Sequence, residues 1–187
     1  TTIMDRHGKD AIAVDVIPIP GVQIKEGFSR IPMWVADMNF ATVPTIQDAI
    51  IRRVNHPAFG YFQPCEEYFQ KIIEWQRDRN HVDGLTKECI GYENGVLGGV
   101  MSALQVLCSP GDHVLLHSPT YIGFTGCMTN YGYHIVHSDL VLDEQGIWRM
   151  DYEDMDRKLK EYRIHAAVFC SPHNPSGRVW EQWEIEK

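Results

Sequence analysis

The sequence predicts an α/β fold built on a mostly parallel sheet, on the strength of two observations. Strand-like apolar runs alternate with helical patterns between about residue 89 and residue 170, and this order favours parallel strands joined by helices. The last of these runs, Ala166–Cys170, leads directly into a loop rich in Pro, Asn and Gly. Ligands of open α/β sheets bind just outside the carboxyl ends of the strands, so this loop is a candidate functional site.

Residues 1–43 are predicted to form an irregular arm, because Pro and Gly recur along them and interrupt regular elements. Within the arm, Ile31–Phe40 is too apolar for a free linker, and we expect it to pack against another part of the protein. The remaining residues, 44–187, are predicted to form a different domain.

Two helices, each with one apolar face, are predicted next. The first begins at Pro44, since proline is well tolerated in the first turn of a helix, and it continues to about Val54. The second runs from Glu66 to Arg79. In both segments the apolar residues recur at the spacing of one helix face.

The alternating region then supplies the predicted sheet and the helices that connect it. Strands are predicted at four places: near 89–91 and over 113–117, 134–137 and 166–170. One helix is predicted over Val96–Leu107 and another opens after Tyr121. A third runs to about Tyr162 and begins at Asp151, whose side chain is a suitable N-terminal cap.

The chain has 187 residues, of which 17 are basic and 25 acidic, for a net charge of −8. A surface that binds nucleic acid or an anionic membrane needs clustered Lys and Arg, so the acidic balance argues against both partners. No apolar run approaches the roughly 18 residues of a membrane span, and the first residues lack the apolar core of a signal peptide. We therefore expect a cytoplasmic protein.

The cysteines and histidines do not predict a metal site. The five cysteines are odd in number and include no C-x-x-C pair, so neither a zinc site nor a disulfide framework is indicated. His113 and His117 share one face of a predicted strand, and together with His137 or His173 they could bind a metal. No carboxylate lies at a supporting spacing, so we interpret most histidines as satisfied or exposed side chains.

Three positions could carry chemistry at the ends of predicted elements. The helix that begins after Asn94-Gly95 offers free backbone N–H groups to an anion, although the segment is neither a dinucleotide fingerprint nor a Walker A loop. Tyr121 could stack on a flat cofactor or simply cover the core. Asn174 offers an amide, yet Asn-Pro is also a common turn dipeptide. Their shared place after successive strands favours a functional interpretation.

Taken together, these segments resemble the fold-type I pyridoxal-phosphate enzymes, the class I/II aminotransferase superfamily, and within it the MalY/PatB group of cystathionine β-lyase-like C–S lyases. The matching segments follow the family order: Pro32–Phe40, Phe59–Tyr61, Asn94–Val96, Pro110–Leu115, Ser118–Tyr121 and His173–Trp180. The resemblance implies a three-layer α/β/α sheet, incomplete in this chain. It assigns 1–43 to part of a small domain and 44–187 to the first portion of a large pyridoxal-phosphate-binding domain.

The resemblance also implies a site for the cofactor pyridoxal 5′-phosphate. The backbone at Gly95, Val96 and Leu97 would hold the phosphate. Tyr121 would stack on the pyridine ring, and Asn174 would hydrogen-bond its 3′-oxygen.

Further implications concern the substrate and a second subunit. Tyr61 would reach the phosphate of a neighbouring subunit, which makes the expected active unit a homodimer. Ala36 and Asp37 would line the substrate entrance, near the carboxylate of an amino acid. The family often has cis peptide bonds at the positions of Pro119 and Pro175, where the cost of a cis bond is small.

None of the seven lysines stands in the sequence context of the family's Schiff-base lysine, so no catalytic residue is predicted within the chain. The aspartate that pairs with the pyridinium nitrogen and the arginine that binds the substrate carboxylate are also missing. We expect the chain to be the N-terminal portion of a protein about twice as long. By itself it should expose apolar surface and be inactive.

The function implied for the intact protein is β-elimination of cystathionine or another cysteine S-conjugate to a thiol, pyruvate and ammonia. Transamination of an amino acid by the same superfamily is one alternative. A regulatory role through protein binding is another, because some members of the group bind a transcription factor.

Overall fold

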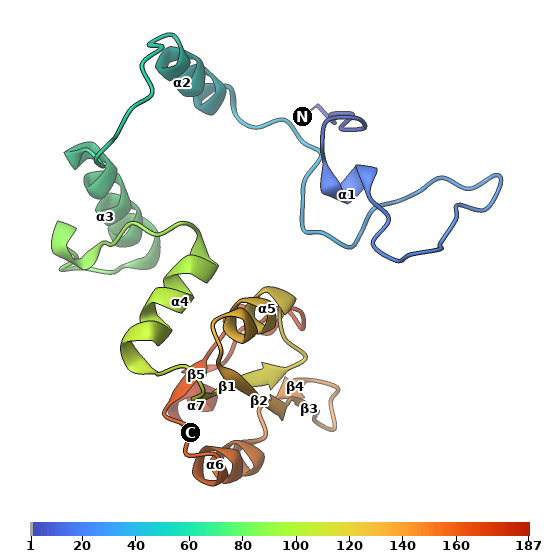
Figure 1. The fold of residues 1–187 in the computed structure, drawn as a ribbon, viewed down its shortest axis with the longest axis vertical. Coiled ribbons are helices and arrows are strands. Elements are labelled where there is room, and N and C mark those ends of the chain that lie inside the picture. Colours follow the sequence, from blue (N-terminus) through green and yellow to red (C-terminus); the bar gives the residue numbers. More distant parts are fainter. Residues whose placement is uncertain (1) are drawn as a thin grey trace. The chain divides into compact units, whose positions relative to one another are not determined.

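The computed structural model describes residues 2–187. The chain divides into two compact units, Thr1–Pro64 and Cys65–Lys187, whose elements are labelled in Figure 1. Among the described residues, no helix is both long enough and apolar enough to cross a membrane.

The first unit contains two helices, α1 over Ile12–Asp15 and α2 over Pro44–Val54. The second of these confirms the helix predicted from Pro44. The arm is otherwise irregular, as expected, and closes on itself through an isolated bridge between Ile3 and Phe40.

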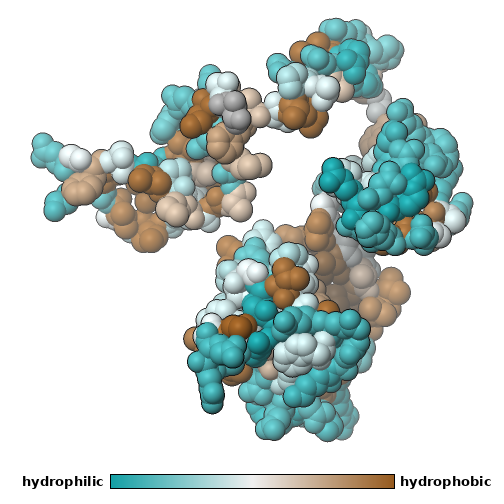
Figure 2. Space-filling model, turned by 180° about the vertical axis from the view of Figure 1, so that it is seen from behind, coloured by the Kyte–Doolittle hydropathy of each residue, from teal (hydrophilic) through white to brown (hydrophobic). Residues whose placement is uncertain are grey.

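The apolar segment Ile31–Phe40 is only partly packed, which corrects the expectation that it is covered. Val35 packs against the small buried cluster of Ala11, Ala13 and Val14. Ile31 and Met33, in contrast, are 75% and 88% exposed. The reason is that the buried cluster of this unit is too small to cover a ten-residue apolar segment. Figure 2 shows hydrophobic residues, in brown, at several places on the surface.

The second unit begins with helices and continues into the alternating region. Its helices are α3 over Glu66–Asn80, the short 3-10 helix η1 over Lys87–Cys89, α4 over Val96–Leu107, α5 over Ile122–Asn130, α6 over Tyr152–Glu161 and α7 over Gln182–Glu186. The Asp151 side chain accepts a hydrogen bond from the Asp154 N–H at 3.0 Å, which confirms the predicted cap of α6. The short helix α7 was not predicted.

The sheet is parallel and has β1 in its centre. Its strands are β1 over His113–Ser118, β2 over His134–Asp139 and β5 over Ala166–Val168, in the order β2-β1-β5. A separate antiparallel pair, β3 over Val141–Leu142 and β4 over Trp148–Arg149, flanks a turn in which the Gly146 N–H donates to the Asp143 carbonyl at 2.9 Å. The three main strands confirm those predicted in this region.

The strand predicted near residues 89–91 is absent from the described structure, and η1 occupies part of that segment instead. The N–H of Cys89 donates to the Thr86 carbonyl at 3.0 Å, and the N–H of Ile90 donates to that of Lys87 at 3.1 Å. These local bonds compete with a strand ladder. A run of three residues that ends at Gly91 has too little apolar surface to favour the sheet.

Helices cover both faces of the sheet, which confirms the predicted three layers. Because side chains alternate along a strand, Val114 and Leu116 of β1 pack on one face with residues of α4 and α5. Leu115 lies on the other face, in a cluster with Val136 and with Leu159 of α6. Figure 1 shows α5 and α6 on opposite sides of the strands. The peptide bonds before Pro119 and Pro175 are cis, as expected, and so is that before Pro172.

A buried ion cluster fastens α7 to the antiparallel pair. Glu184 is almost fully buried and pairs with Arg149 at 2.9 Å and with Arg178. Burial alone would raise the pKa of Glu184, but the Glu181 N–H and the two guanidinium groups outweigh it and hold the pKa below its usual range. The Glu184 side chain therefore stays ionised and supplies the negative charge that pairs with Arg149 and Arg178.

Replacing Glu184 with Gln should lower the free energy of unfolding by about 3 kcal/mol at neutral pH, because two guanidinium groups lose their buried counter-charge. The folded-state pKa is depressed, so this contribution is complete above the unfolded value of 4.5 and disappears as the pH falls below it. Urea unfolding of the parent and of Glu184→Gln, followed by tryptophan fluorescence, measures the difference in their free energies of unfolding. This difference should shrink as the pH falls from 7 to 3. The control Glu186→Gln alters an exposed carboxylate that accepts a hydrogen bond from Gln182 and should change little.

Candidate functional site

The carboxyl ends of β1 and β5 meet at one edge of the sheet. The two strands pair in parallel with Leu116 opposite Val168, so the loops that follow them leave from the same edge. Tyr121 lies in the first loop and Asn174 in the second. This pairing explains why both loops begin at the same edge of the sheet.

A pocket of about 410 Å³ opens at the start of α4. It is lined by Asn94, Gly95, Val96, Leu97, Tyr121 and Phe124. The structure thus brings together four residues proposed from the sequence, Gly95, Val96, Leu97 and Tyr121. Asn174 is not one of the lining residues.

The start of α4 presents backbone N–H groups to this pocket. Gly95 precedes the helix at φ +84°, a conformation that favours glycine, and no side chain caps the helix. The first helical bond runs from the Gly99 N–H to the Gly95 carbonyl at 3.1 Å. The N–H groups of Val96, Leu97 and Gly98 therefore have no acceptor within the helix and, with the helix dipole, favour an anion.

The ring of Tyr121 lies across the beginning of α5. It meets Phe124 edge-on, with ring centroids 5.5 Å apart, and the residue keeps 40% of its surface exposed. A Cβ atom added at Gly123 would lie 2.3 Å from Cε1 of Tyr121. Gly123 is therefore needed for this ring position, a role that sequence reasoning missed because nothing in the local pattern distinguishes it from any other helix glycine.

The loop that carries Asn174 is closed by its own backbone. The His173 N–H donates to the Arg178 carbonyl at 2.7 Å, and the Gly177 N–H donates to the His173 carbonyl at 2.6 Å. The ring Nδ1 of His173 also lies 2.8 Å from Oγ of Ser176. Asn174 itself is exposed, so its amide stands on a rigid loop and faces solvent.

Buried aromatic rings pack against the base of the loop that carries Asn174. Trp180 donates from Nε1 to the Cys170 carbonyl at 2.9 Å, and its ring lies 6.1 Å from that of His117 and 5.7 Å from that of His173. Burial lowers the pKa of both histidines, and the nearby His173 lowers that of His117 further. Two neutral imidazoles thus serve as packing groups, which the sequence could not distinguish from other histidines.

The remaining predicted residues, Tyr61, Ala36 and Asp37, belong to the first unit. Tyr61 is fully exposed. The Asp37 carboxylate pairs with Nη1 of Arg6 at 2.7 Å, and Ala36 beside it is exposed. Their positions within that unit leave the side chain of Tyr61 and the backbone around Ala36 accessible.

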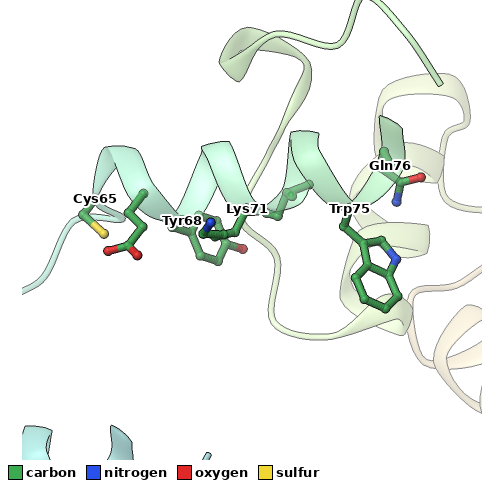
Figure 3. A pocket seen from close by; sticks show the side chains of 7 residues that line it. Cys65, Tyr68, Lys71, Trp75 and Gln76 are labelled. Atoms are coloured by element: carbon green, nitrogen blue, oxygen red, sulfur yellow. The ribbon is translucent and has the colours of Figure 1, made fainter. Parts of the chain in front are cut away.

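A larger pocket than the one at the start of α4, of about 620 Å³, lies elsewhere in the second unit and is formed by a single element. Its lining residues all come from Cys65 and the following helix α3. Figure 3 shows Cys65, Tyr68 and Trp75 along the same side of that helix. Because no second element contributes polar groups that converge on a ligand, this groove is an uncovered helix face rather than a candidate active site.

Comparison with known proteins assigns the chain to a family. The model of the family described as "Aminotransferase class I and II" matches residues 31–187. The chain belongs to this family.

Three relatives illustrate the similarity. Cystathionine beta-lyase PatB of Bacillus subtilis is 34% identical over 157 residues, which cover 84% of this chain and 40% of the relative. The PLP-bound C-S lyase from Staphylococcus hominis has a TM-score of 0.82 and 29% identity, covering 98% of this chain and 45% of that one. Cystalysin from Treponema denticola, whose structure contains a pyridoxal 5′-phosphate cofactor, has a TM-score of 0.85 and 28% identity over 100% of this chain and 46% of that one.

The structural matches confirm the expected fold-type I architecture, of which this chain contains part. The chain spans less than half the length of each of these three proteins.

Replacing Gly95 with Ala should weaken phosphate binding at the start of α4, because alanine at this positive φ is strained by about 1 kcal/mol and shifts the helix start. The measurement is the shift of the Val96 and Leu97 amide resonances on addition of inorganic phosphate. The matched control Gly84→Ala has nearly the same φ, +81°, and likewise open space around the added Cβ. Equal phosphate responses in the two variants would contradict an anion site at Gly95.

Proposed function

We propose that the intact protein is a pyridoxal-phosphate enzyme that cleaves the C–S bond of cystathionine or another cysteine S-conjugate, and that residues 1–187 alone are inactive. The observation that carries the proposal is the pocket in which the uncapped start of α4 meets the exposed ring of Tyr121. An anion-binding helix start beside an aromatic face fits a flat ring that bears a phosphate. The similarity to PatB and to C-S lyases of known structure supports the same assignment.

The residues of this chain fit the parts of the cofactor as follows. The N–H groups of Val96 and Leu97 bind the phosphate, with Gly95 leaving room for its approach. Tyr121 stacks on the ring, and Asn174 donates from its amide to the 3′-oxygen. The carboxylate of Glu93 lies near the same helix start, since a Cβ atom at Gly98 would be 3.7 Å from its Oε2, so a bound phosphate and this side chain must avoid each other.

When bound, pyridoxal phosphate withdraws electrons from the α-carbon of an amino acid and so eases removal of the α-proton and departure of a β-thiolate. The contribution of this chain is to hold and orient that group.

The first unit is proposed to contribute to substrate binding and assembly. Ala36 and Asp37 line the substrate entrance, where the Arg6 guanidinium offsets the Asp37 charge and reduces its repulsion of a substrate carboxylate. Tyr61, fully exposed in its unit, reaches the phosphate of a neighbouring subunit in a homodimer. The same proposal includes a domain boundary between residues 43 and 44 and a cytoplasmic location.

Transamination is the second candidate function, and the description of the matching family model favours it. Both reactions begin with removal of the α-proton from an amino acid, and they differ in whether a β-substituent leaves.

Incubation of the intact protein with pyridoxal phosphate and L-cystathionine should release homocysteine, pyruvate and ammonia in equal amounts, with one water consumed for each, whereas residues 1–187 alone should release none. Colorimetric thiol and pyruvate assays measure this. A keto-acid acceptor should not raise the rate. If a new amino acid forms from the acceptor and no thiol is released, the protein is a transaminase rather than a lyase.

Gly123→Ala should weaken pyridoxal phosphate binding by about tenfold, because the added methyl displaces the Tyr121 ring that stacks on the cofactor. Equilibrium dialysis measures the affinity. Gly126→Ala is the matched control on the same helix, where an added Cβ meets no atom within 4 Å, and its affinity should equal that of the parent. A normal affinity in Gly123→Ala would show that Tyr121 does not stack on the ring.

A further inference from the structure

A second cluster of reactive side chains lies at the opposite edge of the sheet from the proposed cofactor pocket. Cys108 immediately follows α4, Asp112 immediately precedes β1, and His165 immediately precedes β5. Their candidate ligand atoms, a thiol sulfur, a carboxylate oxygen and an imidazole nitrogen, all lie within 4.8 Å of one another. Because β1 separates the two edges by about 20 Å, this cluster is outside the proposed active site.

The parallel pairing of the strands explains why such distant residues meet. Val114 lies opposite Ala166 in the ladder, so the residues that precede the two strands emerge side by side. Sγ of Cys108 and Nε2 of His165 are 3.7 Å apart although 57 positions separate them in the sequence. No pattern of local spacing could have revealed this pair.

The turn that carries two of the three groups is already fixed by hydrogen bonds. The Ser109 N–H donates to Oδ2 of Asp112 at 2.8 Å, and the Cys108 N–H donates to the Leu104 carbonyl at 2.7 Å. The Gly111 N–H donates to the Gly132 carbonyl at 2.8 Å. A ligand that binds here therefore finds the thiol and the carboxylate already ordered.

The distances suit a tetrahedral ion. Zinc bonds of about 2.0–2.3 Å place neighbouring ligand atoms roughly 3.3–3.7 Å apart. The sulfur-to-nitrogen distance of 3.7 Å meets this requirement, and Nε2 of His165 lies 4.0 Å from Oδ2 of Asp112. The His165 side chain is 55% exposed, so its ring has room to turn toward Asp112.

The donor groups of the cluster favour a cation. A divalent ion between a Cys108 thiolate and the Asp112 carboxylate would offset the repulsion between these two groups. It would also replace the contact between Nε2 of His165 and the Leu107 carbonyl, which are 3.0 Å apart.

We propose that Cys108, Asp112 and His165 form a binding site for a borderline-soft divalent cation such as Zn²⁺, with water as the fourth ligand. The combination of thiolate, imidazole and carboxylate is the donor set that zinc accepts. The ion would tie the end of α4 to the beginning of β5. The site is independent of the proposed enzymatic function, and it was not predicted from the sequence, which indicated no metal.

The test is titration of the full chain with Co²⁺, whose tetrahedral complexes absorb in the visible and whose bonds to sulfur add a charge-transfer band in the near ultraviolet. The parent protein should show both features with a stoichiometric end point, and Zn²⁺ should abolish them by competition. The spectra are taken as differences from the same sample without metal, so that a bound organic cofactor does not contribute.

Cys108→Ser should lose the sulfur band, whereas the control Cys65→Ser, which alters an exposed thiol outside the cluster, should retain it. His165→Asn, at a half-exposed position that tolerates substitution, should reduce Co²⁺ affinity at least tenfold, whereas the exposed control His137→Asn should not. Loss of the band in Cys65→Ser, its persistence in Cys108→Ser, or an unchanged affinity in His165→Asn would overturn the proposal.

Discussion

The parallel pairing of β1 with its two neighbours is the constraint on which both proposed sites depend. Val114, Leu115 and Leu116 of this strand are almost completely buried, and their side chains alternate between the two helical layers. Because the strands are parallel and in register, the loops that follow β1 and β5 leave from one edge of the sheet. The residues that immediately precede these strands lie at the other edge. A shift of one residue would move Leu115 and Leu116 to the wrong faces and separate both groups of residues.

The two edges differ in what the backbone provides. At the carboxyl edge, the uncapped start of α4 supplies N–H donors beside an aromatic ring, which suits a phosphorylated, planar ligand. At the amino edge, α4 ends in a turn that presents a thiol and a carboxylate beside a histidine. The same helix thus contributes its positive end to one proposed site and residues of its C-terminal turn to the other.

The sequence predicted most of the alternating region because its apolar runs are long and bounded by turn residues. The residues alone indicated the helix start at Gly95 and Tyr121, and the resemblance to the aminotransferase superfamily added Val96 and Leu97 to the same expected site. It failed where tertiary contacts decide the outcome: Gly123 matters only because the Tyr121 ring lies over it, and His165 meets Cys108 only through the sheet. The strand expected near residue 90 was wrong because a three-residue apolar run does not distinguish a strand from a tight turn.

The most direct test of the central claim, that the start of α4 and Tyr121 form a cofactor site, is a crystal structure of the protein with pyridoxal phosphate. The account predicts phosphate oxygens within hydrogen-bond distance of the Val96 and Leu97 N–H groups and the pyridine ring against the ring of Tyr121. A cofactor whose phosphate lies away from these N–H groups, or whose ring does not contact Tyr121, would contradict it.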